Sequence, residues 1–206
     1  WVQRKVKSSL KQLKISSLYG LLIHKTEDLS GNYGIKLIDA LNEVKLNGLV
    51  KKIGISIYDP KECEKVMKLK RIDIVQAPLN IIDRRLEKSG WLSRLHAEEI
   101  EIHTRSVFLQ GLLLMPRNKI PKIFDKWSKV WDQWSLKLED NNLSALEACL
   151  SYPLSLPEID KLIVGVESAD QLNDIIDKSQ YKKKKIDCSF MTSNDQMLIN
   201  PRNWYK

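Results

Sequence analysis

Helical and extended hydrophobic patterns alternate along most of this chain, and that alternation restricts its fold more than any other feature. Short apolar runs typical of strands lie at residues 18–23, 50–56, 72–76, 100–106 and 162–166. Helical periodicity is expected between them, at 6–13, 35–46, 60–69, 90–98, 120–138, 143–152 and 169–177. Strands separated by helices pair in parallel, because a tight hairpin cannot join parallel neighbours. The predicted class is α/β, with about five parallel strands and two extra helices before the last one.

Local signals mark where several of these segments begin and end. Asp59 and Pro60 predict an N-cap and a first helical position, and Asn47 with Gly48 predicts the end of the preceding helix. A turn-rich loop is expected at 25–33. The pattern leaves open whether the sheet is open and doubly wound or closed as a barrel. No G-x-G-x-x-G follows a strand, which favours the barrel.

Composition predicts one globular domain spanning residues 1–206, with 180–206 as a C-terminal tail. The chain has 206 residues, 43% of them hydrophobic, which is enough to bury a core. Its longest dense apolar run, 107–115, contains Gln110 and Gly111 and is too short to span a membrane. No secretory signal is recognised, so we expect a soluble cytoplasmic protein. Because Trp1 already lies in an amphipathic pattern, we expect the chain to be cut at its front.

Charge and cysteine content exclude some classes of function. The net charge is +8, but the basic residues are spread over many segments and the dense run at 182–185 has few aromatic neighbours. We therefore expect no nucleic-acid partner. Three cysteines without a C-x-x-C pair indicate neither a disulfide framework nor a metal site, and we expect reduced, buried thiols.

A polar residue or glycine lies at the carboxyl end of each of the five predicted strands. In an α/β barrel the carboxyl ends of the strands form the active face, so these positions are candidate site residues. Any one of them is more often a hydrogen-bonded structural residue, but five such ends together favour a site. They are His24, Ser56, Gln76, Arg105 with Ser106, and Gly165 with Glu167.

Five segments carry a resemblance to the aldo-keto reductase family, over nearly the whole chain to about residue 176. They read SLKQL with LYGLLIH, GLVKKIGISIYD, IDIVQAPLNIIDRR, EIHTRSVFLQGLLL and LIVGVESADQL. The third resembles the family's D-V-V-Q-x-x-Y-N segment most closely. The resemblance implies a (β/α)8 TIM barrel, incomplete in this chain, and a nicotinamide-dependent oxidoreductase that reduces an aldehyde, ketone or sugar-like carbonyl.

The resemblance also implies residue roles. His24 takes the place of the catalytic histidine, Ser56 and Gln76 would contact the nicotinamide carboxamide, and Arg105 would stack on the nicotinamide ring. Ile57 departs from the pattern, since many members carry a second carboxamide contact, asparagine, there. The remaining cofactor contacts implied are Ser106, Phe108 and Gln110 in the loop, and Gly165, Glu167 and Gln171 at the closing strand and helix start, whose amides suit a phosphate.

The family resemblance implies NADP(H) as cofactor, with NAD(H) as the alternative, because the arginine that some members use for the adenosine 2′-phosphate is absent. The family's catalytic group is Asp, Tyr, Lys and His. The resemblance places the first three before Trp1, so only His24 is matched. A second interpretation therefore stands beside the enzyme: a non-catalytic nucleotide-binding or regulatory module, or an inactive truncated fragment.

Aromatic residues recur at helical spacing in the long predicted helix, at Phe124, Trp127, Trp131 and Trp134. Core packing is the first interpretation and a substrate-capping wall the second. His103 alternates with Arg105 and is expected to be a hydrogen-bonded interior residue, whereas His96 is expected at the surface.

Overall fold

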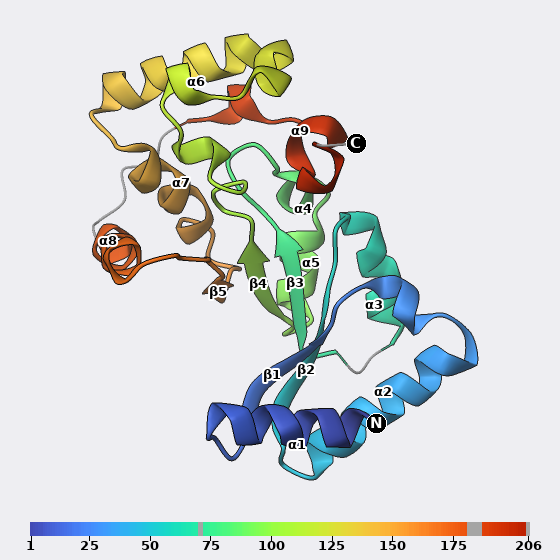
Figure 1. The fold of residues 1–206 in the computed structure, drawn as a ribbon. Helices are drawn as coiled ribbons and strands as arrows, with labels where there is room; N and C mark the ends of the chain where they lie inside the picture. Colours follow the sequence, from blue (N-terminus) through green and yellow to red (C-terminus); the bar gives the residue numbers. More distant parts are fainter. Residues whose placement is uncertain (70–71, 181–186, 205–206) are drawn as a thin grey trace. The chain divides into compact units, whose positions relative to one another are not determined.

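The structure, a computed structural model, describes residues 1–69, 72–180 and 187–204. Its strands form one five-stranded sheet in the order β1-β2-β3-β4-β5, so neighbours in the sheet are also successive strands along the chain (Figure 1). Helices lie between successive strands, and the strands run parallel. The predicted α/β class is therefore confirmed. The strands are β1 Leu18–Ile23, β2 Val50–Ser56, β3 Ile74–Pro78, β4 Glu101–Arg105 and β5 Lys161–Leu162.

The α-helices of the described residues follow the expected order. They are α1 Val2–Leu13, α2 Gly31–Leu46, α3 Cys63–Lys68, α4 Arg85–Lys88, α5 Trp91–Ala97, α6 Ser128–Asn141, α7 Ala145–Leu154, α8 Ala169–Gln180 and α9 Gln196–Ile199. Local signals account for several ends. Gly48 has φ 70° just after α2, and Asp59 forms a capping box with Glu62 at the turn that leads into α3, as its position predicted.

The chain divides into two compact units. Unit 1 comprises Trp1–Ala77 and Ser89–His103, and unit 2 comprises Pro78–Lys88 and Thr104–Lys206. The single domain expected from the sequence stays a prediction.

The core of unit 1 lies between strands β1 to β3 and the helices that connect them. Ile53 and Ile55 of β2 are fully buried, and Val44 of α2 is nearly so. Gly54 lies so close to β3 that an added Cβ would approach the Ile74 carbonyl oxygen to 2.6 Å. Only glycine fits this position, and the close approach keeps β2 and β3 in register.

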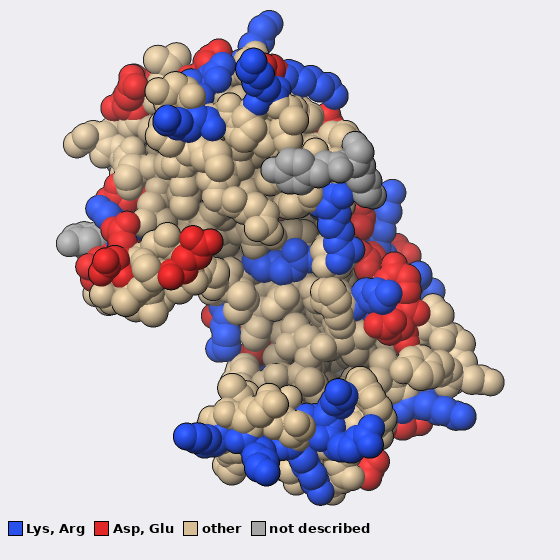
Figure 2. All heavy atoms as spheres, in the orientation of Figure 1, with Lys and Arg blue, Asp and Glu red and all other residues tan. Residues whose placement is uncertain are grey.

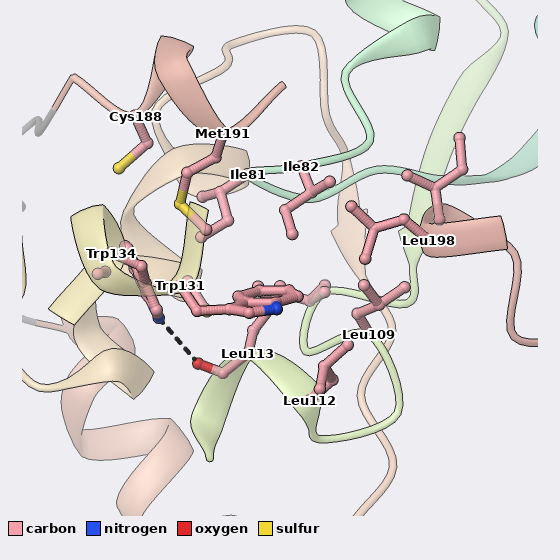
Figure 3. Packing of buried hydrophobic residues seen from close by; sticks show 14 of the residues in the cluster. Ile81, Ile82, Leu109, Leu112, Leu113, Trp131, Trp134, Cys188, Met191 and Leu198 are labelled. Atoms are coloured by element: carbon pink, nitrogen blue, oxygen red, sulfur yellow. Dashed lines mark hydrogen bonds between the residues drawn. The ribbon is translucent and has the colours of Figure 1, made fainter. Parts of the chain in front are cut away.

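The core of unit 2 gathers apolar residues from four stretches of chain, within 81–82, 107–113, 124–149 and 188–199. Figure 3 shows the packing of part of this cluster. Trp131 and Trp134 of α6 are buried, and their indole N–H groups donate to the carbonyl oxygens of Phe124 and Leu113, at 3.1 and 3.3 Å. Phe124 is buried in the same cluster, and Trp127 packs against it half-buried. The core interpretation of this aromatic stripe is therefore confirmed.

The segment expected as a C-terminal tail contributes to this same core. Of its described residues, Cys188 and Met191 are buried in the cluster, and so are Leu198 and Ile199 of α9 (Figure 3). The basic run at 182–185 lies outside the described residues. Cys63, Cys149 and Cys188 are free and buried, as expected, and burial raises the pKa of Cys63 to about 12 and that of Cys188 to about 11.

Several predicted segments were wrong in extent. The helix expected at 120–138 begins as a 3-10 turn, Lys122–Trp127, before α6. The loop expected at 25–33 contains the 3-10 turn Thr26–Leu29 and the start of α2, and α4 was not foreseen. The strand expected at 162–166 is reduced to β5, because strand length depends on a neighbour that supplies ladder hydrogen bonds, which an apolar run does not reveal.

Among the described residues, no helix is both long enough and apolar enough to cross a membrane.

Candidate functional site

Ser56 and Gln76 lie opposite each other at the carboxyl end of β2 and in β3 of unit 1. The Ser56 hydroxyl donates to Gln76 Oε1 at 3.3 Å. Ser56 is 5% exposed and Gln76 is half-buried, so this bond is partly shielded from water. Because Oε1 accepts, the side-chain amide is oriented with Nε2 as its donor end. The pair presents a hydroxyl and an amide together, which suits recognition of another amide.

Ile57 follows Ser56 and is fully buried. Its backbone N–H donates to the Gln76 carbonyl oxygen at 2.8 Å, which extends the β2–β3 ladder past the last residue of β2. The Ile57 side chain is therefore part of the core. An isoleucine side chain has no polar atom, so it cannot make the carboxamide contact that the resemblance implies for asparagine at this position.

His24 is the first residue after β1 and is exposed. Its Nε2 lies 3.5 Å from the hydroxyl of Tyr58, and the two rings meet edge-on at 76° with centroids 6.5 Å apart. A separation of 3.5 Å is at the long limit for a hydrogen bond. Tyr58 follows β2 by two residues, so parallel pairing brings both side chains to the same edge of the sheet. Tyr58 was not predicted from the sequence, although its place just past a strand end is the signal that identified the others.

The loop after β4 in unit 2 is unusually rich in left-handed backbone. Ser106, Leu109 and Gln110 have φ of 62°, 46° and 56°, and Gly111 has φ 82°. Residues other than glycine adopt this region rarely and at a cost in free energy. Such turns point successive backbone N–H groups to one side, an arrangement that suits an anion.

Asn80 holds this loop in place and was not predicted. It is 1% exposed, and its Nδ2 donates to the Ser106 carbonyl oxygen at 2.9 Å. Its Oδ1 accepts from the backbone N–H groups of Ile82 and Asp83 at 2.9 and 2.8 Å. A polar residue inside the apolar stretch 77–82 is the signal that could have identified it.

A cavity of about 830 Å³ lies in unit 2, within the size range of small-molecule sites. All seven site residues predicted for this part of the chain line it. The loop after β4 contributes Arg105, Ser106, Phe108 and Gln110, and the segment after β5 contributes Gly165, Glu167 and Gln171.

Gly165, in the cavity wall, leaves open space beside it. This residue is exposed, and an added Cβ there would meet nothing within 4 Å. Arg105 supplies positive charge, and one of its terminal nitrogens donates to the Ser106 hydroxyl at 3.3 Å. The cavity thus combines volume, a cation and a loop with left-handed backbone, which fits an anionic ligand of nucleotide size.

Amides at the start of α8 are partly occupied within the chain. The Glu167 N–H donates to Gln171 Oε1 at 2.9 Å, and the Gln171 N–H donates to the Ser168 hydroxyl at 3.2 Å. These two amides are already hydrogen-bonded within the chain, and the phosphate contact expected at this helix start stays a prediction.

A second polar cluster lies at the opposite, amino ends of the strands of unit 1. Glu101 accepts hydrogen bonds from the Tyr19 hydroxyl at 2.5 Å and from Lys52 Nζ at 2.7 Å, and its other oxygen lies 3.1 Å from His103 Nε2. His103 is 5% exposed, so its expected role as a satisfied interior residue is confirmed, and His96 is exposed as expected. This end of the strands is associated with stability rather than catalysis.

Charged groups are distributed unevenly over the surface. Basic side chains gather over α1, where Arg4, Lys5, Lys7 and Lys11 are exposed and no acidic residue occurs (Figure 2). The described residues contain no group of three or more His, Cys, Asp or Glu side chains placed to hold a metal ion.

Comparisons with known proteins agree with this geometry. The sequence profile described as Aldo/keto reductase family matches residues 1–193. A curated relative, the uncharacterized oxidoreductase YqkF of Bacillus subtilis (strain 168), is 25% identical over 203 residues, which cover 89% of this chain and 61% of the relative.

Solved structures share the fold. The holo form of the aldo-keto reductase AKR11C1 from Bacillus halodurans superposes with a TM-score of 0.74 at 19% identity, covering 93% of this chain and 65% of that one. The glycerol dehydrogenase AKR11B4 from Gluconobacter oxydans superposes with a TM-score of 0.60 at 18% identity, covering 90% and 66%. The chain thus spans less than two thirds of the length of these relatives. Its five-stranded sheet with helices has the barrel architecture of these reductases, and the chain belongs to the aldo/keto reductase family.

Proposed function

We propose that this chain supplies the nucleotide-binding part of an NAD(P)H-dependent oxidoreductase that reduces an aldehyde, ketone or sugar-like carbonyl to an alcohol. One observation carries the proposal: the seven cofactor contacts implied for unit 2 line a single cavity of about 830 Å³. Family membership and the oxidoreductase relative support the same reaction class.

Different residues of this chain would bind different parts of the nucleotide. Ser56 and Gln76 would hold the nicotinamide carboxamide, because their hydroxyl and amide lie side by side. Arg105 would stack on the nicotinamide ring and neutralise phosphate charge, since a guanidinium can do both. The left-handed loop at Ser106 to Gly111 would direct backbone N–H groups at the pyrophosphate.

When bound, the reduced nicotinamide supplies the hydride. His24 would orient the substrate carbonyl by a hydrogen bond to its oxygen and share in proton transfer, because it is exposed at a strand end. The Tyr58 hydroxyl, 3.5 Å from His24 Nε2, would restrict the orientation of that ring. We place the protein in the cytoplasm, where the three free thiols would stay reduced.

A second candidate function uses the same cavity. Most of the site residues assigned to this chain are cofactor contacts, and His24 is the one assigned a catalytic role. A non-catalytic nucleotide-binding or regulatory module, or an inactive fragment, would keep the cavity and lack turnover. Binding without turnover separates it from the enzyme.

Titration of the 206-residue chain with NADPH and NADH, followed by nicotinamide fluorescence and calorimetry, tests the nucleotide site. Gln76→Ala and Arg105→Ala should each weaken binding about tenfold or more, equivalent to ~1.4 kcal/mol. Arg4→Ala on exposed α1 is the matched control and should leave binding unchanged. If neither nucleotide binds, the proposal is wrong.

Oxidation of NAD(P)H over a panel of aldehydes, ketones and sugars then tests the reaction. His24→Ala should lower kcat for any substrate that is turned over, with little effect on nucleotide binding. Nucleotide binding without turnover of any panel member would contradict the enzyme and support the binding module.

A further inference from the structure

We infer that the cavity of unit 2 discriminates against a ribose 2′-phosphate, so that this chain prefers NAD(H) to NADP(H). The inference rests on the proposed nucleotide function and specifies which nucleotide the site takes. It reverses the preference for NADP(H) that the family resemblance implied.

The charges on the cavity wall carry the inference. Among the described residues that line the cavity, Arg105 is the one cation, whereas Glu167 and Asp174 are both acidic. Arg105 belongs to the loop side, beside Ser106, and both carboxylates belong to the α8 side. Asp170 and Asp177, which also lie on α8, are outside the cavity lining and are not part of this wall.

Hydrogen bonding at the start of α8 also disfavours a phosphate on this side of the cavity. The backbone N–H of Glu167 donates to Gln171 Oε1, and that of Gln171 donates to the Ser168 hydroxyl. A phosphate on this side of the cavity would therefore compete with bonds that the chain already makes. It would gain less from the helix start than an uncapped helix would offer.

The two nucleotides differ by one phosphate monoester, which carries about −1.5 to −2 charge at neutral pH. Both contain a pyrophosphate, which the proposed function assigns to Arg105 and the loop after β4. The extra phosphate of NADP(H) would then face Glu167 or Asp174, and like charges repel. The ribose 2′-hydroxyl of NAD(H) can instead donate a hydrogen bond to a carboxylate.

The test is calorimetric titration of the 206-residue chain with NADH and with NADPH at low and at high salt. NADH should bind at least about tenfold more tightly at low salt. Raising the salt concentration should narrow the difference, because salt screens the repulsion between exposed charges.

Substitutions in the cavity wall test which side chains cause the preference for NADH. Glu167→Gln and Asp174→Asn remove one negative charge each with little change in shape, and each should strengthen NADPH binding severalfold without strengthening NADH binding. Glu167→Lys should bring NADPH to equal or tighter binding than NADH. Asp177→Asn is the matched control, because it removes the same charge from exposed α8 outside the cavity lining and should change neither affinity.

The outcomes separate the two proposals. Equal affinities in the unsubstituted chain, or tighter binding of NADPH, would overturn this inference and leave the nucleotide site standing. Failure of both nucleotides to bind would overturn the proposed function and this inference with it. A preference for NADH that Asp177→Asn abolishes as fully as Glu167→Gln would reject the cavity wall as its source.

Discussion

The hydroxyl of Ser56 donates to Oε1 of Gln76 across the paired strands β2 and β3, over 3.3 Å. Each side chain is thereby oriented by the other. Gly54 two residues earlier permits the close approach of the strands on which this contact depends.

A double-mutant cycle measures this pairing. Ser56→Ala and Gln76→Ala should show a coupling of about 0.5–1.5 kcal/mol in the free energy of unfolding, the net value of one partly buried hydrogen bond. Urea denaturation followed by circular dichroism supplies the four values. Ser56→Ala combined with Gln12→Ala, on the exposed face of α1, should be additive. Additivity in the Ser56 and Gln76 cycle itself would contradict the contact.

Asn80→Ala should destabilise the chain by about 1–3 kcal/mol, because two buried backbone N–H groups lose their acceptor and the Ser106 carbonyl keeps only its bond from the Leu109 N–H. It should also speed proteolytic cleavage in the loop 106–111, measured by mass spectrometry. Asn173→Ala on exposed α8 is the control and should lie within about 0.5 kcal/mol of the unsubstituted chain. Equal cleavage rates in both variants would show that Asn80 does not hold the loop.

Acid stability should depend on Glu101. Burial raises the pKa of this carboxyl, but hydrogen bonds from Lys52, Tyr19 and His103 outweigh burial and lower it from 4.5 to about 2. A carboxyl with a lowered folded-state pKa stabilises the fold above its unfolded value, and the contribution is lost as pH falls from about 4.5 to 2. The contribution at neutral pH is on the order of 3 kcal/mol.

Glu101→Gln should therefore lower stability at pH 7 and flatten its dependence on pH in the acid range, measured by urea unfolding at successive pH values. Glu64→Gln, at an exposed position in α3, should keep the unsubstituted profile. The hydrogen bond to Glu101 also raises the pKa of Lys52. The contribution of Lys52 to the stability of the fold should therefore be lost only as the pH rises above 10.5. If the free energy of unfolding of Glu101→Gln fell with acid as steeply as that of the unsubstituted chain, the hydrogen bonds of Glu101 would not stabilise the fold.

Trp131→Ala should destabilise the chain by about 3–5 kcal/mol, since the side chain is 1% exposed at the centre of the unit 2 core (Figure 3). Trp131→Phe should cost less, because it keeps an aromatic ring and loses the hydrogen bond to the Phe124 carbonyl. Trp1→Ala, at a position 76% exposed, should stay within about 0.5 kcal/mol. Unfolding by urea compares the three, and similar losses at Trp131 and Trp1 would contradict this core.

Sequence alone determined the class of this fold and the residues worth examining. Apolar runs and helical spacing depend on local chemistry, so β1 and β2 begin and end at the predicted residues. In α/β barrels the carboxyl ends of the parallel strands form the active face. Polar residues at the predicted strand ends, such as Ser56, Gln76 and Arg105, could therefore be named as site candidates from the sequence. Asp59 and Glu62 form a cap because that bond spans three residues.

Tertiary structure decided what depends on residues far apart in the chain. β5 is two residues long because its ladder depends on what the neighbouring strand offers, while its own apolar run suggested five. Asn80 meets Ser106 across 26 positions and Tyr19 meets Glu101 across 82, distances over which periodicity carries no information. Asp174 likewise lines the cavity together with residues of the loop after β4, a proximity that the sequence does not reveal. Local patterns constrain which residues can reach a site, but the balance of charge inside it is set by the packing that brings them together.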